Sequence, residues 1–157
     1  MILIIGYGNP LRCDDAIGQQ IAQEMKACLK RNDVEVLLTF QLTPELVENV
    51  SCSELVVFID ARIDGTPGEV TQETIKPQAV SGAFTHNVSP RSLLATAYEL
   101  YGALPKGIMI SISGADFSYG CELSPELHEK LPSIADQVKA IIESSARVQV
   151  YEEKQDV

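Results

Sequence analysis

The chain has 157 residues, 45% of them hydrophobic, which is enough for one domain with its own core and too short for a second. Its 22 acidic residues outnumber its 12 basic residues and give a formal net charge of −10. That charge repels phosphate backbones and anionic lipids, so functions on nucleic acids and membrane surfaces are disfavoured, whereas a basic protein partner fits.

The amino terminus and the cysteines indicate a cytoplasmic protein. The apolar run at 1–5 lacks a basic leader and meets Gly6 at once, so it predicts neither a signal peptide nor a membrane-spanning helix. The four cysteines include no CxxC pair, and we expect reduced thiols instead of a zinc ribbon or a disulfide framework.

The first part of the chain has the pattern of a strand, a loop, a helix and a second strand. Ile and Leu residues at 2–5 predict the first strand, and apolar residues at helical spacing over 16–29 predict the helix. Asp14 or Asp15 stands where the N-cap of this helix is expected. The second strand is expected at 34–40.

The middle of the chain predicts a short helix and two further strands. Thr43-Pro44 opens the helix, which reaches about residue 50. The run at 55–59 is apolar on both sides, as a parallel sheet covered on both faces requires, and it ends in Asp60. The more polar stretch 69–75 predicts an antiparallel edge strand.

The last part of the chain predicts a helix, a buried strand and a final helix. Ser89-Pro90 opens a helix to about Tyr101, and 107–113 has the pattern of a buried strand. The final helix opens at 124–126. The complete order of elements, βαβαββαβα, predicts an α/β protein, a three-layer α/β/α sandwich with a twisted, mostly parallel sheet of about five strands.

The final helix contains Pro132, so we expect a kink or a break near Leu131 and a second part that ends near Ser145. We expect a single catalytic domain over 1–147 and a frayed tail over 148–157.

Loops at the carboxyl ends of the predicted strands carry groups suited to chemistry. In an open parallel sheet these loops meet where the strand order reverses, and ligands bind there. The candidates are Asp14 or Asp15, then Asp60, and finally His86. Two carboxylates and an imidazole form a ligand set that suits a borderline divalent metal such as nickel or zinc.

Each candidate also has a simpler explanation. An aspartate at position 14 or 15 is commonly a helix cap, Asp60 can form the turn after its strand, and His86 can be a surface imidazole. The candidates are far apart in the sequence, so only the fold can bring them together.

Other catalytic patterns are absent or incomplete. Gly6-x-Gly8 resembles the start of a dinucleotide site, but the third small residue is missing and Pro10 removes an amide donor. No Gly-x-Ser-x-Gly elbow occurs, and Cys13 has no local histidine to activate it. A nucleotide- or cofactor-binding module of Rossmann or flavodoxin type stays open as an alternative.

The segment from Gly6 to Gly18, GYGNPLRCDDAIG, resembles the opening signature G-x-G-N-x-x-x-x-D-[DE]-x-x-G of the hydrogenase maturation proteases. Asp60 and Ala61, at the end of an apolar run, resemble the second block of that family, and Thr-His-Asn at 85–87 resembles the third. The resemblance spans most of the chain in the same order. It implies a twisted five-stranded sheet between helices.

The resemblance also implies a function and a site. It implies an aspartyl-type endopeptidase that removes the carboxyl-terminal extension of a [NiFe]-hydrogenase large-subunit precursor after nickel insertion. Asp15, Asp60 and His86 match both the catalytic and the metal-binding residues, with nickel supplied by the substrate and with zinc or cadmium also able to occupy the site. An aspartate such as Asp14 or Asp60 can serve as the base. We expect a monomer.

The chain departs from the family pattern at two places. Some members have Glu at the position of Asp15, and many have a glycine-rich turn where this chain has Gln-Leu-Thr-Pro at 41–44, a difference that can tune which large subunit is accepted. A further alternative is a metal chaperone that docks on the immature subunit without cutting it.

Overall fold

The computed structural model describes residues 1–79 and 88–155, and the described strands form a single five-stranded sheet. These strands are β1 (Ile2–Tyr7), β2 (Val34–Thr39), β3 (Leu55–Arg62), β4 (Val70–Ile75) and β5 (Lys106–Ser113). Their order is β2-β1-β3-β5-β4, and among them the β4–β5 pair is antiparallel while the other pairs are parallel. The predicted fold class and the antiparallel edge strand are therefore confirmed.

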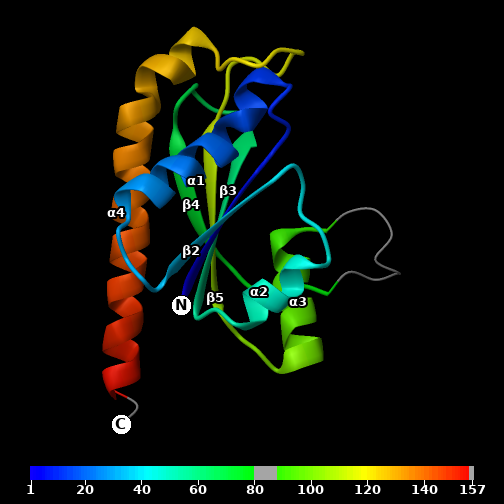
Figure 1. Cartoon of the computed structure of the whole chain (residues 1–157), viewed down its shortest axis with the longest axis vertical. Helices are drawn as coiled ribbons and strands as arrows, with labels where there is room; N and C mark the ends of the chain where they lie inside the picture. Colours follow the sequence, from blue (N-terminus) through cyan, green and yellow to red (C-terminus); the bar gives the residue numbers. More distant parts are fainter. Residues whose placement is uncertain (80–87, 156–157) are drawn as a thin grey trace.

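Helices cover both faces of this sheet (Figure 1). They are α1 (Ile17–Cys28), α2 (Leu46–Ser51), α3 (Pro90–Tyr101) and α4 (Pro125–Gln155), and a short 3-10 turn, η1 (Cys13–Ala16), precedes α1. The helices α1 and α4 lie on one face, and α2 and α3 lie on the other. None of the described helices combines the length and the apolar composition needed to cross a membrane.

Each face of the sheet has its own hydrophobic core because side chains alternate along a strand. In β1, Ile2 and Ile4 face α1 and α4, whereas Leu3 and Ile5 face α2 and α3. These side chains are at most 4% exposed, and full burial of one such side chain contributes about 1.5–3 kcal/mol. The continuous apolar runs of β1 and β3 follow from this double burial.

The strand order creates a switch point between β1 and β3. The chain leaves β1 through α1 to reach β2 on one side, and it then returns through α2 to place β3 on the other side of β1. The loops after β1 and β3 therefore diverge at the same end of the sheet, which is where open α/β sheets bind ligands.

The helix predicted at Ser89-Pro90 is confirmed in detail. Ser89 accepts a hydrogen bond from the Ser92 amide at 3.1 Å, Ser92 Oγ accepts one from the Ser89 amide at 2.8 Å, and the pair forms a capping box. Gly102 ends the helix in the left-handed conformation with φ of 66°, which glycine adopts without steric cost.

Two local predictions differ from the structure. The N-cap of α1 is Ala16, whose side chain cannot accept a hydrogen bond, and both neighbouring aspartates lie in η1 instead. The final helix is one continuous element that extends past Ser145 to Gln155, although Figure 1 shows its first turns set at an angle to the rest, as expected with Pro132 inside it. Fraying of 148–157 stays a prediction.

Candidate functional site

Asp60 is a polar residue at the end of an otherwise apolar run. Side chains alternate along β3, so Asp60 lies on the same face as Val56 and Phe58, which pack under α2 and α3. Its carboxylate is half-buried, and Oδ1 accepts a hydrogen bond from the Ala61 amide at 2.8 Å. The strand thus carries a carboxylate to the margin of the core.

Tyr7 is the neighbour of Asp60 on the adjacent strand. Gly6 of β1 pairs with Ile59 of β3 in the parallel ladder. The residues that follow, Tyr7 in β1 and Asp60 in β3, therefore lie side by side. The Tyr7 hydroxyl donates to the Met109 sulfur at 3.9 Å and lies close enough to the Asp60 carboxylate to affect its pKa. Asp60 therefore has a phenol on one side and the Ala61 amide on the other.

Asp15 reaches the same end of the sheet from η1. Its Oδ2 accepts a hydrogen bond from the Asn9 amide at 2.7 Å, and Asn9 Oδ1 in turn accepts one from the Leu11 amide at 2.9 Å. Gly8, between β1 and this loop, has φ of 142°, and a Cβ there would overlap the main-chain oxygen of Asp15. The loop after β1 thus folds back on itself and holds Asp15 close to the strand ends.

Two further glycines let α1 lie directly against the sheet. A Cβ on Gly6 would collide with the Ala22 side chain, and a Cβ on Gly18 would collide with the main-chain oxygens of Ile59 and Tyr7. The glycines of the signature segment therefore have a steric purpose, because they allow the start of α1 to approach the ends of β1 and β3.

The negative charge of Asp15 acts on the carboxylate of Asp60. The pKa of Asp60 is raised to about 6, mainly by burial and also by the negative charge of Asp15, while the Ala61 amide and the Tyr7 hydroxyl act in the opposite direction. Burial and the charge of Asp60 raise the pKa of Tyr7, so its hydroxyl stays a neutral donor. A proton or a cation would relieve the repulsion between Asp15 and Asp60.

Asp14, the other aspartate of the predicted pair, has a different environment. Its side chain is fully buried, with Oδ2 accepting from the Ala115 amide at 2.7 Å and the Asp116 amide at 3.0 Å. Its Oδ1 accepts from the Ser124 amide at 2.7 Å. Because both oxygens are engaged inside the protein, the hypothesis that Asp14 serves as a base does not fit; it anchors the loop after β5.

The third predicted ligand, His86, lies outside the described residues. Within 1–79 and 88–155, no group of three His, Cys, Asp or Glu side chains is placed to hold a metal ion. The structure brings Asp15 and Asp60 together, and the completion of the set by His86 stays a prediction.

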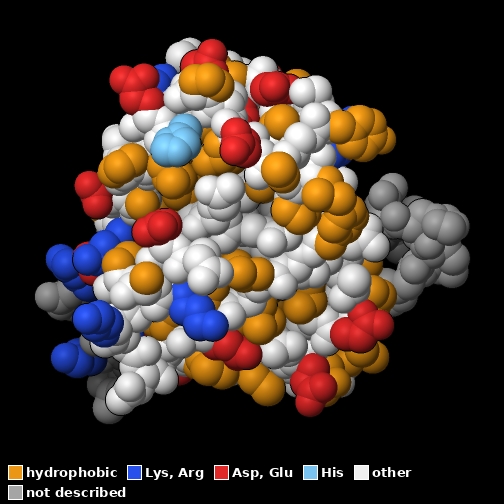
Figure 2. Space-filling view, turned by 45° about the horizontal axis from the view of Figure 1, so that its top comes forward, with side chains coloured by type: hydrophobic (Ala, Val, Ile, Leu, Met, Phe, Trp, Pro, Cys, Tyr) orange, Lys and Arg blue, Asp and Glu red, His pale blue; other side chains and the backbone are white. Residues whose placement is uncertain are grey.

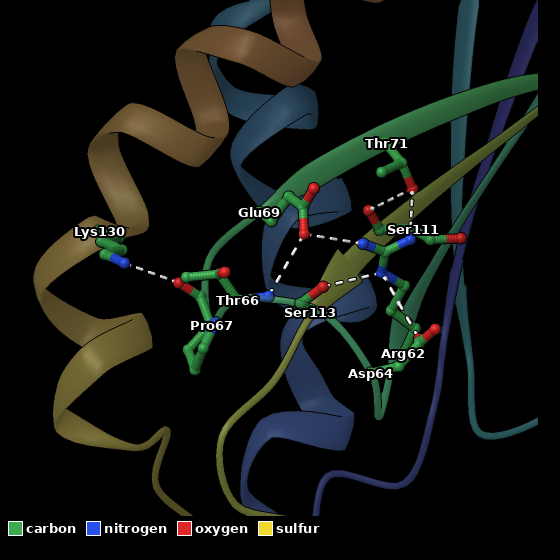
Figure 3. A network of polar contacts seen from close by, with 9 residues as sticks. All are labelled: Arg62, Asp64, Thr66, Pro67, Glu69, Thr71, Ser111, Ser113 and Lys130. Atoms are coloured by element: carbon green, nitrogen blue, oxygen red, sulfur yellow. Dashed lines mark hydrogen bonds and ion pairs between the residues drawn. The ribbon is translucent and has the colours of Figure 1, made fainter.

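A network of hydrogen bonds and ion pairs connects the strands beyond Asp60 (Figure 3). Arg62, two residues further along β3, donates from Nε to Ser113 Oγ at 2.8 Å and from Nη2 to Glu69 Oε2 at 2.9 Å. A longer contact of 3.4 Å reaches Thr71 Oγ1, and Asp64 lies 3.7 Å away. One guanidinium therefore ties the end of β3 to the end of β5 and to β4.

The turn between β3 and β4 is attached to α4 by the same network. Glu69 Oε2 also accepts from the Thr66 amide at 3.3 Å, and the Lys130 ammonium donates to the Pro67 carbonyl at 2.7 Å (Figure 3). These bonds fix the loop after β3, which leaves the sheet at the candidate site.

Sequence reasoning missed three residues that support the site. Tyr7 and Arg62 act across strands, so only the register reveals them. Gln19 Nε2 donates to the carbonyls of Gly8 and Thr39, both at 2.8 Å, and so holds the ends of β1 and β2 together. A glutamine inside a helical pattern gives no local signal of such a role.

The fold and the acidic pair define an α/β protein whose switch point is suited to a cation or a proton, not to a phosphate. No model of a known protein family matches the chain. Hydrogenase 2 maturation protease of Escherichia coli strain K12 is 24% identical over 150 residues, which is 92% of this chain and 92% of the relative.

Solved structures of similarly named proteins share the fold. The hydrogenase maturating endopeptidase HybD from Escherichia coli has a TM-score of 0.74 at 23% identity, covering 92% of this chain and 93% of that one. The [NiFe] hydrogenase maturation protease HycI from Thermococcus kodakarensis KOD1 has a TM-score of 0.69 at 26% identity, covering 90% and 92%.

These comparisons confirm the predicted resemblance to the hydrogenase maturation proteases. The similar proteins are named proteases or endopeptidases, which are hydrolases of peptide bonds, the enzyme class predicted from the sequence. The similarity extends over almost the whole length of each pair of proteins.

Proposed function

We propose that this chain is an endopeptidase that removes the carboxyl-terminal extension of a [NiFe]-hydrogenase large-subunit precursor after nickel insertion. The observation that supports it most is the juxtaposition of Asp15 and Asp60 at the switch point of a fold that resembles the maturation proteases over 92% of the chain. The proposal places a monomer in the cytoplasm, with the precursor as its partner.

Nickel in this proposal belongs to the substrate. Asp15 and Asp60 offer carboxylate oxygens from two loops, and His86 would add an imidazole, a mixed set that suits nickel and equally zinc or cadmium. The mutual repulsion of the two carboxylates favours binding of a cation. A precursor without nickel would leave this repulsion uncompensated, so the site would distinguish loaded from unloaded precursor.

Asp60 is the better candidate for the proton acceptor in cleavage. When no cation is bound, its raised pKa of about 6 makes it a stronger base than an ordinary aspartate while leaving it ionised at neutral pH. The hydrogen bond from the Ala61 amide orients its carboxylate. A water held beside Asp60 would lose its proton to the carboxylate as its oxygen bonds to the scissile carbonyl carbon, and the carboxyl group would then pass that proton to the amide nitrogen as the C–N bond breaks.

The Rossmann or flavodoxin alternative has less support. A phosphate cradle needs free main-chain amides after the first strand. Here the Asn9 amide already donates to the Asp15 carboxylate, Pro10 has no amide proton, and Asp15 itself would repel a phosphate. The non-cutting metal chaperone requires the same acidic pair, so experiment has to separate it from the protease.

The test is to mix the purified protein with nickel-loaded, unprocessed large subunit and to follow the mass of the subunit over time, with nickel-free precursor as the control. Loss of one discrete carboxyl-terminal peptide from the loaded form alone is the expected result. An intact subunit that nevertheless binds the chain would favour the chaperone, and binding of a nucleotide or flavin would favour the cofactor module.

Variants then test the site. Asp15→Asn, Asp60→Asn and His86→Ala should each abolish cleavage, while Asp136→Asn, an exposed aspartate on α4, should cleave like the unmodified chain. Circular dichroism of every variant checks the fold. Normal processing by all three site variants would refute the assignment of the site.

A further inference from the structure

Large apolar side chains stand exposed around the candidate site. One such residue follows each parallel strand at its carboxyl end: Leu11 after β1, Phe40 after β2, Ile63 after β3 and Tyr119 after β5. Their exposed fractions are 61%, 55%, 83% and 84%. We call these four residues the apolar rim. An exposed apolar surface among polar residues commonly marks a protein interaction site.

Main-chain hydrogen bonds place the rim residues around one end of the sheet. The Gly120 amide donates to the Leu11 carbonyl at 3.0 Å, which joins the loop that carries Leu11 to the loop that carries Tyr119. The Gly114 amide donates to the Arg62 carbonyl at 2.9 Å, so Ile63 lies beside the end of β5. The Gly8 amide donates to Thr39, next to Phe40, at 3.3 Å.

The part of the rim formed by Leu11 and Tyr119 is held in place by internal bonds. The Arg12 guanidinium lies over the Tyr119 ring, 5.1 Å from its centroid, and Arg12 Nε donates to the Phe117 carbonyl at 3.3 Å. Asp14 secures the same loop through the three amides described above. An exposed tyrosine that is fixed in this way loses little side-chain entropy when a partner binds.

The charges near the apolar rim indicate which kind of partner it would bind. Exposed carboxylates of Asp64, Asp116 and Glu122 lie in the same loops as Ile63 and Tyr119, and Asp15 and Asp60 lie at the same end of the sheet. Figure 2, which turns this end of the molecule forward, shows hydrophobic side chains spread over the face with acidic side chains between them. The surface therefore complements a polypeptide that is apolar and basic.

We propose that the apolar rim is the docking surface for the polypeptide substrate, and that it receives a segment with large apolar side chains next to at least one basic residue. This inference rests on the proposed protease function and adds a recognition surface that is separate from Asp15 and Asp60. Docking on the rim would position the scissile bond over the acidic pair, with the basic side chain of the segment near the exposed carboxylates.

The chain offers matched controls at the opposite end of the molecule. Tyr98 and Leu100 lie on α3, are 54% and 68% exposed, and belong to no part of the rim. The double variant Leu11→Ala/Tyr119→Ala can therefore be compared with Tyr98→Ala/Leu100→Ala, which removes the same kinds of side chain. Both pairs are exposed, so both variants should keep the thermal stability of the unmodified chain.

The experiment measures steady-state cleavage of the nickel-loaded precursor. The rim variant should raise KM about tenfold and change kcat less than about twofold, because the rim contributes to binding and not to chemistry. The α3 variant should leave both constants unchanged. Tyr119→Phe should also behave like the unmodified chain, since the ring still packs under Arg12 and presents the same apolar area.

The outcomes separate the two proposals. A rim variant that cleaves with unchanged KM while the unmodified chain is active overturns the docking inference alone. An equal rise of KM in the α3 variant also overturns it, because the effect would then be nonspecific. An unmodified chain that does not cleave a competent precursor overturns the proposed function and, with it, the inference that rests on it.

Discussion

At the scale of residues, Asp60 combines partial burial with a nearby negative charge, and both make its ionised form unfavourable. The Ala61 amide and the Tyr7 hydroxyl offset only part of this cost, so the pKa stays at about 6 instead of the usual 3.8. A protein retains a carboxylate in such an unfavourable environment where it needs a base or a ligand. We therefore expect this carboxylate to lower the stability of the fold.

Asp60→Asn should therefore increase the free energy of unfolding at pH 7 by about 1 to 2 kcal/mol, a value discounted because the carboxylate is partly exposed. The folded pKa lies above the unfolded one, so the contribution of Asp60 to stability is greatest below about pH 4 and is lost as the pH rises through about 6. The advantage of the variant should accordingly vanish below pH 4.

Urea unfolding at several pH values measures this difference, with Asp136→Asn as the exposed control. A difference between Asp60→Asn and the unmodified chain that does not depend on pH would contradict the assigned protonation behaviour of Asp60. The same variant should not cleave the precursor, because an amide cannot accept the proton.

At the scale of elements, Asp14 joins two loops that are distant in sequence. Its acceptor oxygens satisfy amides located 101 to 110 positions further along the chain, and the attached loop carries Tyr119 of the apolar rim. Arg62 plays a similar part for the ends of β3, β4 and β5. The site thus depends on side chains that connect elements as much as on those that face the substrate.

Asp14→Ala should lower the free energy of unfolding by about 3 kcal/mol, because three main-chain amides lose an acceptor that is itself fully buried. Hydrogen exchange should accelerate at the amides of Ala115, Asp116 and Ser124 beyond the general increase that follows lower stability. Arg31→Ala is a suitable control, since it breaks a pair with Asp33 on the exposed surface and should change stability by less than about 1 kcal/mol.

An exchange pattern in Asp14→Ala that rises evenly over the sheet, with no excess at those three amides, would show that Asp14 does not hold the loop. If hydrogen exchange in Asp14→Ala is fastest at those three amides, and if the variant has a normal kcat and a raised KM, then the loop that Asp14 holds contributes to docking on the rim.

At the scale of the whole molecule, the net charge of −10 acts together with the arrangement of the loops. The parallel strands all end at one side, and that side gathers the acidic pair, the apolar rim and the exposed carboxylates. An approaching basic segment would be attracted over a distance set by the ionic strength, about 10 Å at 0.1 M salt. The charge should therefore influence how fast the substrate is captured.

The ratio kcat/KM for the loaded precursor should fall several-fold between about 0.05 and 0.5 M salt, because screening slows the encounter of opposite charges. The constant kcat should change little. Asp116→Asn/Glu122→Gln should weaken the salt dependence, whereas Asp136→Asn, away from the rim, should leave it intact. A kcat/KM that rises with salt would indicate that apolar contact alone governs capture.

Much of the architecture could be predicted because burial of a strand or helix requires a recognisable pattern of apolar residues in the local sequence. The runs in β1 and β3 are apolar on both sides since two helical layers cover them, and Ser89-Pro90 marks the start of α3 through capping chemistry that involves only neighbours. The edge position of β4 followed from its polar alternation. The resemblance of the Gly6–Gly18 segment selected Asp15 over Asp14, a choice that the position of the two residues before the helix had left open.

The sequence by itself determined the elements, their order along the chain and the end of the sheet at which polar groups gather, because these depend on periodicity and turn chemistry. Only the tertiary structure decided that Asp14 is buried beneath the loop after β5 while the charge of its neighbour Asp15 acts on Asp60, and that Tyr7 lies beside that carboxylate. The physical reason is that hydrogen-bond partners and charge neighbours come from strands and loops distant in sequence, whose register no local pattern encodes.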